Sequence, residues 1–251
     1  MARQAKKIST KRIFKIIIGI IIFFTLPTML FFSILYFMYN EDLPIGKQGN
    51  EADQLAITML RNMNENAYLN TDYLEWTFKN RHYYKWYKSD KMCEVSWDKI
   101  TVLLDLSNCN NSKVFVLDTP YNGIEKQNYI HKAKAYFNND SFWLVAPYKV
   151  FDKGVERRLV ITKENKRALL VTYTSGGTTP GDSYLWHFNT NGKPKSYQMW
   201  VDILPIDGLE ATWNDWITTE SGAVLPTSHR LLFLDLDMGE VKGLNIQNEH
   251  P

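Results

Sequence analysis

A stretch of 23 residues without a charged side chain, from Ile16 to Met38, constrains this chain more than any other feature. About 20 predominantly apolar residues are enough for a helix to cross the hydrocarbon core of a bilayer. Only basic residues precede the stretch, and the acidic residues Glu41 and Asp42 follow it. Because positively charged flanks stay in the cytoplasm, we expect the N-terminus inside and the rest of the chain across the membrane. The basic residues are Arg3, Lys6, Lys7, Lys11, Arg12 and Lys15.

Three other kinds of segment compete with a permanent anchor. A cleaved signal peptide has an apolar core of about 7 to 15 residues and a small-residue cleavage site, whereas this stretch is longer and exits through Phe37, Met38 and Tyr39. A lipoprotein signal needs a cysteine directly after the apolar run, and the first cysteine is Cys93. A buried core helix rarely exceeds about 14 residues without a polar face. We therefore interpret the stretch as an uncleaved anchor.

The charge balance excludes one broad class of partner. The chain carries 29 Lys and Arg against 27 Asp and Glu. Removing the six basic residues of the N-terminal 15 leaves 23 basic against 27 acidic side chains, a net charge near −4. A mildly acidic domain lacks the basic footprint of a nucleic-acid binder. The roughly 200 residues beyond the anchor suffice for one domain with a single core.

Four regions follow from these features. They are a basic cytoplasmic tail at residues 1–15, a transmembrane anchor at 16–39, a short tether at 40–50 and an exported domain at 51–246. The tether is predicted from its proline, glycines and polar residues, which are typical of a connection.

Hydrophobic periodicity in the domain separates two helices from many short strands. Apolar residues recur at helical spacing over 51–68 and 123–138, with Asn122 as a candidate cap for the second helix. From residue 72 onward, short segments instead alternate between apolar and polar residues and are joined by turn-like connections. Short connections favour antiparallel pairing. We therefore predict an α+β fold, a strongly curved antiparallel sheet of about ten strands forming an unclosed β-barrel, covered by two or three helices.

The two cysteines, Cys93 and Cys109, leave two alternatives open. Beyond the membrane the setting is oxidising, so they can pair as a disulfide. They can equally remain two separate buried thiols. Neither has a second Cys or a His nearby at ligand spacing, so we expect no metal there.

Candidate catalytic groups are few and have structural explanations. Asp140 and Asp182 are each predicted in a turn beside aromatic residues, and paired carboxylates can serve as acid and base in glycoside hydrolysis. Asp is also favoured in turns for local hydrogen-bonding reasons, and His187 lies alone on a strand. The loop at 175–182 lacks the lysine of a phosphate-binding loop. We expect no catalysis, no cofactor and no metal.

Aromatic strand residues give the strongest functional signal. An ordinary core under the two helices accounts for most of them. A sharper hypothesis is a partly open cavity between the sheet and the helices, suited to an acyl chain or a similar apolar ligand. The candidate lining residues are Trp76, Phe78, Trp86, Phe142, Trp143, Tyr184, Trp186 and Met199.

Four runs carry a resemblance to a known family. They are YLEWTFKNRHYYKW (73–86), AYFNNDSFWLVAPYKVFD (135–152), ALLVTYTSGGTTPGDSYLW (168–186) and MWVDILPIDGLEATWNDW (199–216). The chain resembles a group of uncharacterised envelope proteins assigned to the LolA/LolB-like superfamily of periplasmic lipoprotein carriers. The resemblance implies a curved sheet whose concave face holds lipid chains. The carriers are soluble or lipid-anchored, unlike this chain, and their functional arginine and protruding loop match no position here, so no functional residue is carried over.

These expectations combine into one functional hypothesis and two alternatives. The chain is expected to be a single-pass protein of the inner, cytoplasmic membrane, with residues 16–38 in the bilayer and a periplasmic C-terminal domain. That domain is expected to bind a lipid, an acyl chain or a lipidated protein without catalysis. The first alternative is a structural or protein-interaction module of the cell envelope with a filled core. The second is a hydrolase of envelope glycans that uses Asp140, Asp182 or His187.

Overall fold

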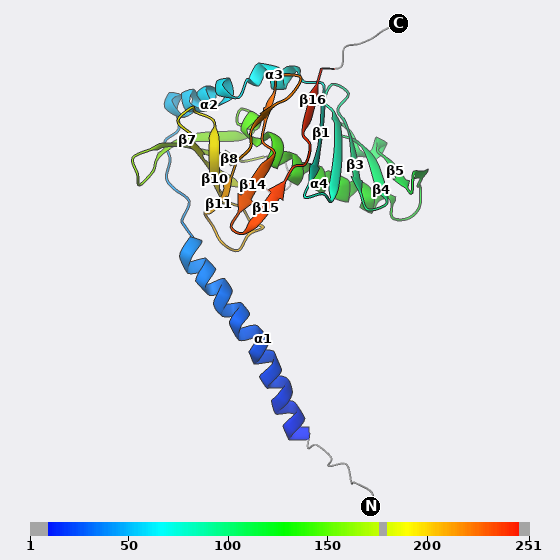
Figure 1. Cartoon of the computed structure of the whole chain (residues 1–251), viewed down its shortest axis with the longest axis vertical. Helices are drawn as coiled ribbons and strands as arrows, with labels where there is room; N and C mark the ends of the chain where they lie inside the picture. The colour runs from blue at the N-terminus through cyan, green and yellow to red at the C-terminus, as the bar shows by residue number, and fades with distance from the viewer. Residues whose placement is uncertain (1–9, 176–179, 246–251) are drawn as a thin grey trace, which may run out of the picture.

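The computed structural model describes residues 10–175 and 180–245. Its first element is a single long helix, α1 (Thr10–Tyr39), which is exposed along its length and includes Pro27. This helix is long and apolar enough to cross a membrane. It projects from one side of the remaining chain (Figure 1). The basic residues Arg3, Lys6 and Lys7, residues 176–179 of the 175–182 loop and the predicted domain end at 246 lie outside the described residues.

The rest of the described chain is α+β, and every strand pair in it is antiparallel. The first sheet has the order β16 (Lys242–Leu244), β1 (Tyr73–Phe78), β2 (His82–Tyr87), β3 (Met92–Trp97), β4 (Ile100–Asp105), β5 (Lys113–Val116), β6 (Thr119–Pro120). The second has the order β15 (Leu234–Asp237), β14 (Ser228–Leu231), β11 (Leu209–Thr212), β10 (Pro194–Trp200), β9 (Ser183–Phe188), β8 (Arg167–Tyr173), β7 (Val155–Ile161). A separate pair joins β12 (Ile217–Thr218) to β13 (Val224–Leu225).

The two large sheets meet along one edge of each. The backbone N–H of Thr77 donates to the carbonyl of Met238 at 3.0 Å, and that of Lys79 donates to Asp237 at 2.8 Å. The chain at the end of β15 therefore pairs first with the end of β1. It then continues into β16, which pairs with the start of β1. Each sheet keeps two distinct end strands, so the described strands form no closed barrel.

Helices lie against these sheets on two sides (Figure 1). The longest, α4 (Lys126–Val145), packs on β3, β4 and β5 and continues into a 3₁₀ turn, η2 (Ala146–Lys149). A second 3₁₀ turn, η1 (Cys109–Asn111), connects β4 to β5. The helices α2 (Asn50–Asn62) and α3 (Glu65–Asn70) lie across the end of the sheets that is remote from α1.

Two helix predictions need correction. The helix expected over 51–68 is divided at Asn64, whose φ of 54° is left-handed and cannot continue an α-helix. The second helix was expected to end at Asn138, before a turn at 139–141. It instead runs on to Val145, because the Asp140 side chain hydrogen-bonds β2 rather than its own backbone. The helix also begins after Glu125 rather than after Asn122.

The predicted antiparallel pairing is confirmed, but the number of strands differs from the prediction. Sixteen strands occur among the described residues where about ten were expected, because eight of the sixteen are only two to four residues long. Alternating burial along β1 and β3 places one face of the first sheet in the core. The pair Asn191-Gly192, which is typical of hairpin turns, lies in the connection from β9 to β10, and Gly192 has a positive φ of 76°.

Candidate ligand cavity

A cavity of about 480 Å³ lies where α4 and η2 face the second sheet. Ligand pockets in proteins generally enclose about 300 to 1,000 Å³, so the cavity has the volume of a small-molecule site. Aromatic and aliphatic side chains make up much of its wall. The lining residues are Trp86, Phe137, Asn138, Asn139, Ser141, Phe142, Trp143, Lys149, Asp152, Lys153, Val155, Tyr173, Ser175, Asp182, Tyr184, Tyr197, Met199, Val201, Ile203, Leu204 and Leu231.

Strand periodicity explains how the sheet contributes its part of the wall. Side chains two apart along a strand share a face. Tyr197, Met199 and Val201 therefore come to the cavity together from β10 and the residue after it, and Tyr184 joins them from β9. The register pairs Met199 directly with Tyr184, which brings the two strands' contributions into contact.

Ring contacts fix the aromatic wall. The Phe142 ring from α4 lies 4.7 Å from the Tyr184 ring and 5.6 Å from the Tyr173 ring. The neighbouring Trp143 lies 5.6 Å from Tyr197. Burial raises the pKa of Tyr173, Tyr184 and Tyr197 above the ordinary value, so these hydroxyls remain neutral at physiological pH. The aromatic part of the wall is thus uncharged, and rings from both helix and sheet hold it in place.

Charged groups occur at one part of the lining. Lys149 forms an ion pair with Asp152 at 3.3 Å, and Lys153 is exposed beside them. Ile203 also lines the cavity and is 69% exposed. Lining residues that are themselves exposed mean that the cavity is open to solvent. The combination of an apolar wall with a few charged groups suits an amphiphilic ligand.

The eight residues predicted to line a cavity fall into two groups. Five of them line it: Trp86, Phe142, Trp143, Tyr184 and Met199. The other three belong to the packed core: Trp76, Phe78 and Trp186.

The three core residues have partners that keep them from the cavity. Trp76 stacks on Tyr84 with ring centroids 4.5 Å apart, and Trp186 lies 5.0 Å from Trp213. Phe78 is also buried. Trp186 shares a face of β9 with Tyr184, so periodicity gave the correct face. Which of the two residues lines the cavity depends on how far along β9 the helix covers that face. Side-chain periodicity does not give this information.

Several lining residues were missed by sequence reasoning. Tyr197 and Val201 alternate with Met199 on the same face, so that pattern could have identified them. Ile203 and Leu204 lie in the β10–β11 connection, where no periodicity operates. Lys149 and Lys153 follow α4, and no pattern in the sequence predicted that they line a cavity.

Asp140 is the centre of a buried polar cluster rather than a turn residue. Its Oδ2 accepts a hydrogen bond of 2.5 Å from the Tyr84 hydroxyl and lies 2.6 Å from Nδ1 of His82. Asn139 donates to its other oxygen at 2.8 Å, and the Asp140 residue is 1% exposed. The His82 ring stacks on Tyr136 at 3.8 Å. These contacts tie α4 to β2.

The remaining predicted acid and histidine lie on different faces. Asp182 lines the cavity and accepts from the backbone N–H of Asp202 at 3.4 Å. His187 lies 3.2 Å from Gln198, whose side chain also bonds Glu41. That contact puts His187 on the face of β9 opposite Tyr184. Asp140, Asp182 and His187 are therefore not gathered at one site.

Both cysteines are free thiols in the structure. Cys93 is buried in β3, and Cys109 is half-buried at the start of η1. Burial raises the pKa of the Cys93 thiol well above its ordinary value. Among the described residues, no group of three or more His, Cys, Asp or Glu side chains could hold a metal ion.

Neither a family model nor a curated protein matches the chain. The resemblance to the lipoprotein-carrier superfamily accordingly stays a prediction.

Proposed function

We propose that the domain binds the apolar chain of a lipid or of a lipidated protein in the cavity beside α4, without catalysis. The observation that carries this proposal is the cavity itself, about 480 Å³ with aromatic walls from both helix and sheet. A filled inner face is what the alternative, a structural or interaction module, would require. An open apolar cavity instead supports a ligand-binding role.

The character of the wall narrows the ligand class. The rings of Phe142, Tyr184 and Trp143 present apolar faces, while Lys149, Lys153, Asp152 and Asp182 contribute charged groups to the lining. An acyl chain fits the apolar faces, and a polar head group fits the charged groups of both signs. The volume suits one chain of this kind rather than a bulky assembly of several.

The position of the domain supports the same ligand class. We place α1 across the inner membrane with the N-terminus in the cytoplasm, which puts the domain on the periplasmic side. The last turn of α1 is followed at once by contacts with the domain: the backbone N–H of Glu41 donates to Asp207 at 3.0 Å. A cavity held this close to a bilayer is suited to ligands that leave or enter it.

The edge-to-edge meeting of the two sheets supports the finer fold proposal. With β1 bonded to both β16 and the chain after β15, thirteen strands follow one another from β6 to β7. We propose that this arrangement is the curved, unclosed barrel that the resemblance implies, with α4 on its concave face.

Hydrolysis is the less supported alternative. It would need Asp140, Asp182 and His187 to converge, yet the Asp140 carboxylate is occupied by Tyr84 and Asn139. His187 faces away from the cavity. A binding role needs none of these groups to react.

Photocrosslinking in a bilayer tests the proposal. The full chain is placed in nanodiscs that contain a phospholipid with a photoreactive acyl chain, irradiated, and mapped by peptide mass spectrometry. We expect adducts on α1, which reports contact with the bilayer, and on peptides that contain Phe142 or Tyr184. Adducts confined to α1 would refute lipid binding in the cavity.

A variant with a filled cavity sharpens this test. Val201→Trp adds bulk to the lining, and Leu69→Trp adds the same side chain at a position on α3 that is 62% exposed. We expect about a tenfold loss of cavity adducts in the first variant and no loss in the second. Because overpacking costs about 1 to 3 kcal/mol, the smaller Val201→Phe serves as a second version if the first folds poorly.

A further inference from the structure

The hairpin that joins β14 to β15 has an apolar tip. Leu231 pairs with Leu234 across the hairpin, so Leu232 and Phe233 form a two-residue turn. Phe233 is 71% exposed and Leu234 is 43% exposed. Four consecutive large apolar residues therefore stand at the end of a projecting hairpin.

The turn is unusual for its backbone as well as its side chains. Two-residue hairpin turns favour Asn and Gly because their central residues take positive φ. Here Leu232 takes a φ of 55°, which costs free energy for a residue with a branched side chain. An exposed tip of Leu and Phe contributes little to folding in water. Such a choice of residues indicates an apolar environment for the tip.

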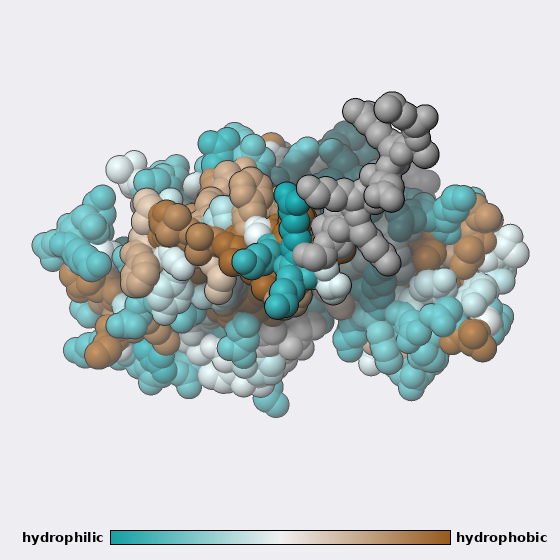
Figure 2. Space-filling model, turned by 90° about the horizontal axis from the view of Figure 1, so that it is seen from below, coloured by the Kyte–Doolittle hydropathy of each residue, from teal (hydrophilic) through white to brown (hydrophobic). Residues whose placement is uncertain are grey.

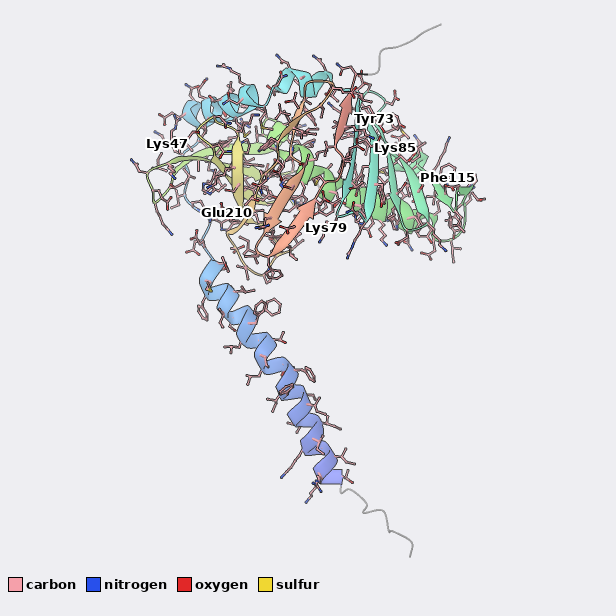
Figure 3. The ribbon with its side chains drawn as sticks, viewed as in Figure 1. Lys47, Tyr73, Lys79, Lys85, Phe115 and Glu210 are labelled. Atoms are coloured by element: carbon pink, nitrogen blue, oxygen red, sulfur yellow. The ribbon has the colours of Figure 1, made fainter. Side chains whose placement is uncertain are left out.

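The tip lies on the side of the domain from which α1 projects. In Figure 1, the β14–β15 hairpin and the connection after β10 both reach toward α1, whereas α3 lies at the opposite end. Figure 3 shows the same direction along β1, with Tyr73 at the end near α3 and Lys79 at the end toward α1. The backbone N–H of Lys79, directly after β1, bonds Asp237, which lies three residues after the tip residue Leu234, so the hairpin extends beyond β1 in this direction.

A second exposed apolar residue borders the cavity that Leu231 of the hairpin also lines. Ile203, in the β10–β11 connection, is 69% exposed. Ile203, Leu204 and Leu231 line the same cavity, so the connection and the hairpin both border it. In the view from below, α1 points toward the reader and lies in front of the domain, and both apolar and hydrophilic groups are seen around it (Figure 2).

The end of α1 is fixed next to this connection. Asn40 directly follows the last helical residue, and its Oδ1 accepts from the backbone N–H of Asp207 at 3.0 Å. The backbone N–H of Glu41 donates a hydrogen bond to the Asp207 carbonyl, also at 3.0 Å. The residue that ends the apolar helix and the loop that carries Ile203 are therefore held together. If α1 spans a bilayer, this loop lies at its surface.

We propose that the hairpin tip at Leu232, Phe233 and Leu234, together with Ile203, inserts into the outer interface of the bilayer that α1 spans. The bilayer is the occupant that the position of α1 selects, because no flexible linker separates the helix end from this surface. The mouth of the cavity then opens at the membrane surface. This proposal requires α1 to span the membrane, and it holds whether or not the cavity binds a lipid.

Depth-dependent quenching tests the insertion. The full chain is reconstituted into liposomes as Phe233→Cys in a Cys109→Ser background, where Cys93 stays buried, and labelled with the fluorophore NBD. Leu69→Cys on α3 is the matched control, exposed to 62% on the side remote from α1. We expect blue-shifted emission at position 233, and quenching by lipids with a nitroxide on the acyl chain that is at least fivefold stronger than at position 69.

Each other outcome overturns the proposal. Equal quenching at both positions means that the domain does not hold the tip at the membrane. A blue shift at position 233 without quenching means that protein, such as a second copy, covers the tip. Leu234→Cys repeats the measurement if the first labelled variant fails to fold. Quenching contains no readout of ligand binding, so its failure is distinct from failure of the photocrosslinking experiment.

Discussion

The indole Nε1 of Trp200 donates a hydrogen bond of 2.8 Å to the backbone carbonyl of Glu41, 159 residues away in sequence. Trp200 belongs to β10, the strand that carries Met199 into the cavity, and Glu41 is the second residue after α1. The bond therefore joins the apolar helix directly to the strand that forms the cavity wall.

Further contacts hold the chain between α1 and α2 against the second sheet. Lys47 forms a two-way backbone bridge with Leu159 on β7, and Figure 3 places Lys47 at that edge. A Cβ at Gly46 would come within 2.6 Å of the Arg158 Cβ, so only glycine fits this close approach. The segment expected to be a tether is thus docked at residues 40–41 and again at 46–48, which restricts how the domain turns relative to α1.

Trp200→Phe is predicted to loosen this docked segment. The change removes one hydrogen bond and keeps an aromatic ring, so we expect a loss of about 1 kcal/mol. Hydrogen exchange at the amides of residues 41–48 should rise about fivefold, which is the equivalent of that free energy. The measurement is exchange mass spectrometry on the full chain in nanodiscs.

Trp216→Phe is the matched control for that prediction. Its indole also donates to a backbone carbonyl, that of Pro194, at 3.2 Å. This variant should lose similar stability without faster exchange at residues 41–48. Equal acceleration in both variants, or none in Trp200→Phe, would show that the indole does not hold the segment.

Asp140→Ala is predicted to destabilise the domain strongly. It leaves the buried Tyr84 hydroxyl and His82 without their acceptor, and an unsatisfied buried partner of a charged group costs about 3 kcal/mol. Tyr84→Phe removes the donor instead and should cost about 1 kcal/mol. Denaturant unfolding followed by tryptophan fluorescence measures both. If the double variant is as unstable as the sum of the single ones, the two residues are not coupled.

Domain stability is predicted to fall at acid pH through His229. Burial lowers the pKa of His229 from 6.5 to about 4 against the opposing effect of backbone carbonyls, including that of Thr212 at 3.0 Å. The unfolded chain binds a proton below about pH 6.5 while the folded chain does not until about pH 4. Unfolding is therefore favoured as pH falls through this window, by about 3 kcal/mol in total.

His229→Gln isolates this effect from the carboxylates that also titrate. The unfolding free energy of the variant should depend less steeply on pH between 6.5 and 4 than that of the wild type. His187→Gln, at a histidine that is not fully buried, controls for loss of an imidazole. Parallel pH profiles for wild type and His229→Gln would contradict a neutral, buried His229.

The two cysteines are predicted to react at different rates. Cys109 is accessible in part, whereas Cys93 is buried and its raised pKa disfavours the reactive thiolate. A thiol reagent should therefore label one cysteine in the folded chain and two after unfolding without reductant. If no cysteine is labelled in the unfolded chain, a disulfide joins Cys93 to Cys109 in the cell envelope.

Local patterns predicted the elements of this chain better than its long-range contacts. The apolar run of α1 and the alternation in β1, β9 and β10 follow from side-chain spacing, which is a local property. Asp140 was misplaced in a turn, because its partners Tyr84 and His82 lie more than 50 residues away. Docking of residues 40–48 was missed for the same reason.

The cavity shows the same difference between local patterns and long-range contacts. Spacing along β9 predicted that Tyr184 and Trp186 share a face, and they do. Only the path of α4 determines that Tyr184 borders open space while Trp186 packs against Tyr197 and Trp213. The path of α4 depends on the hydrogen bonds of Asp140 to the first sheet and on the ring contacts of Phe142 with the second sheet.

The measurement that tests the central claim most directly is a crosslink from inside the cavity. Phe142, which touches Tyr184 and Tyr173, is replaced by a photoreactive phenylalanine in the full chain in its membrane, with Leu69 replaced in the same way as the control. Lipid-binding predicts lipid adducts at position 142 and few at position 69. Adducts only to the protein's own peptides at position 142 would contradict it, because the cavity would then be closed to lipid.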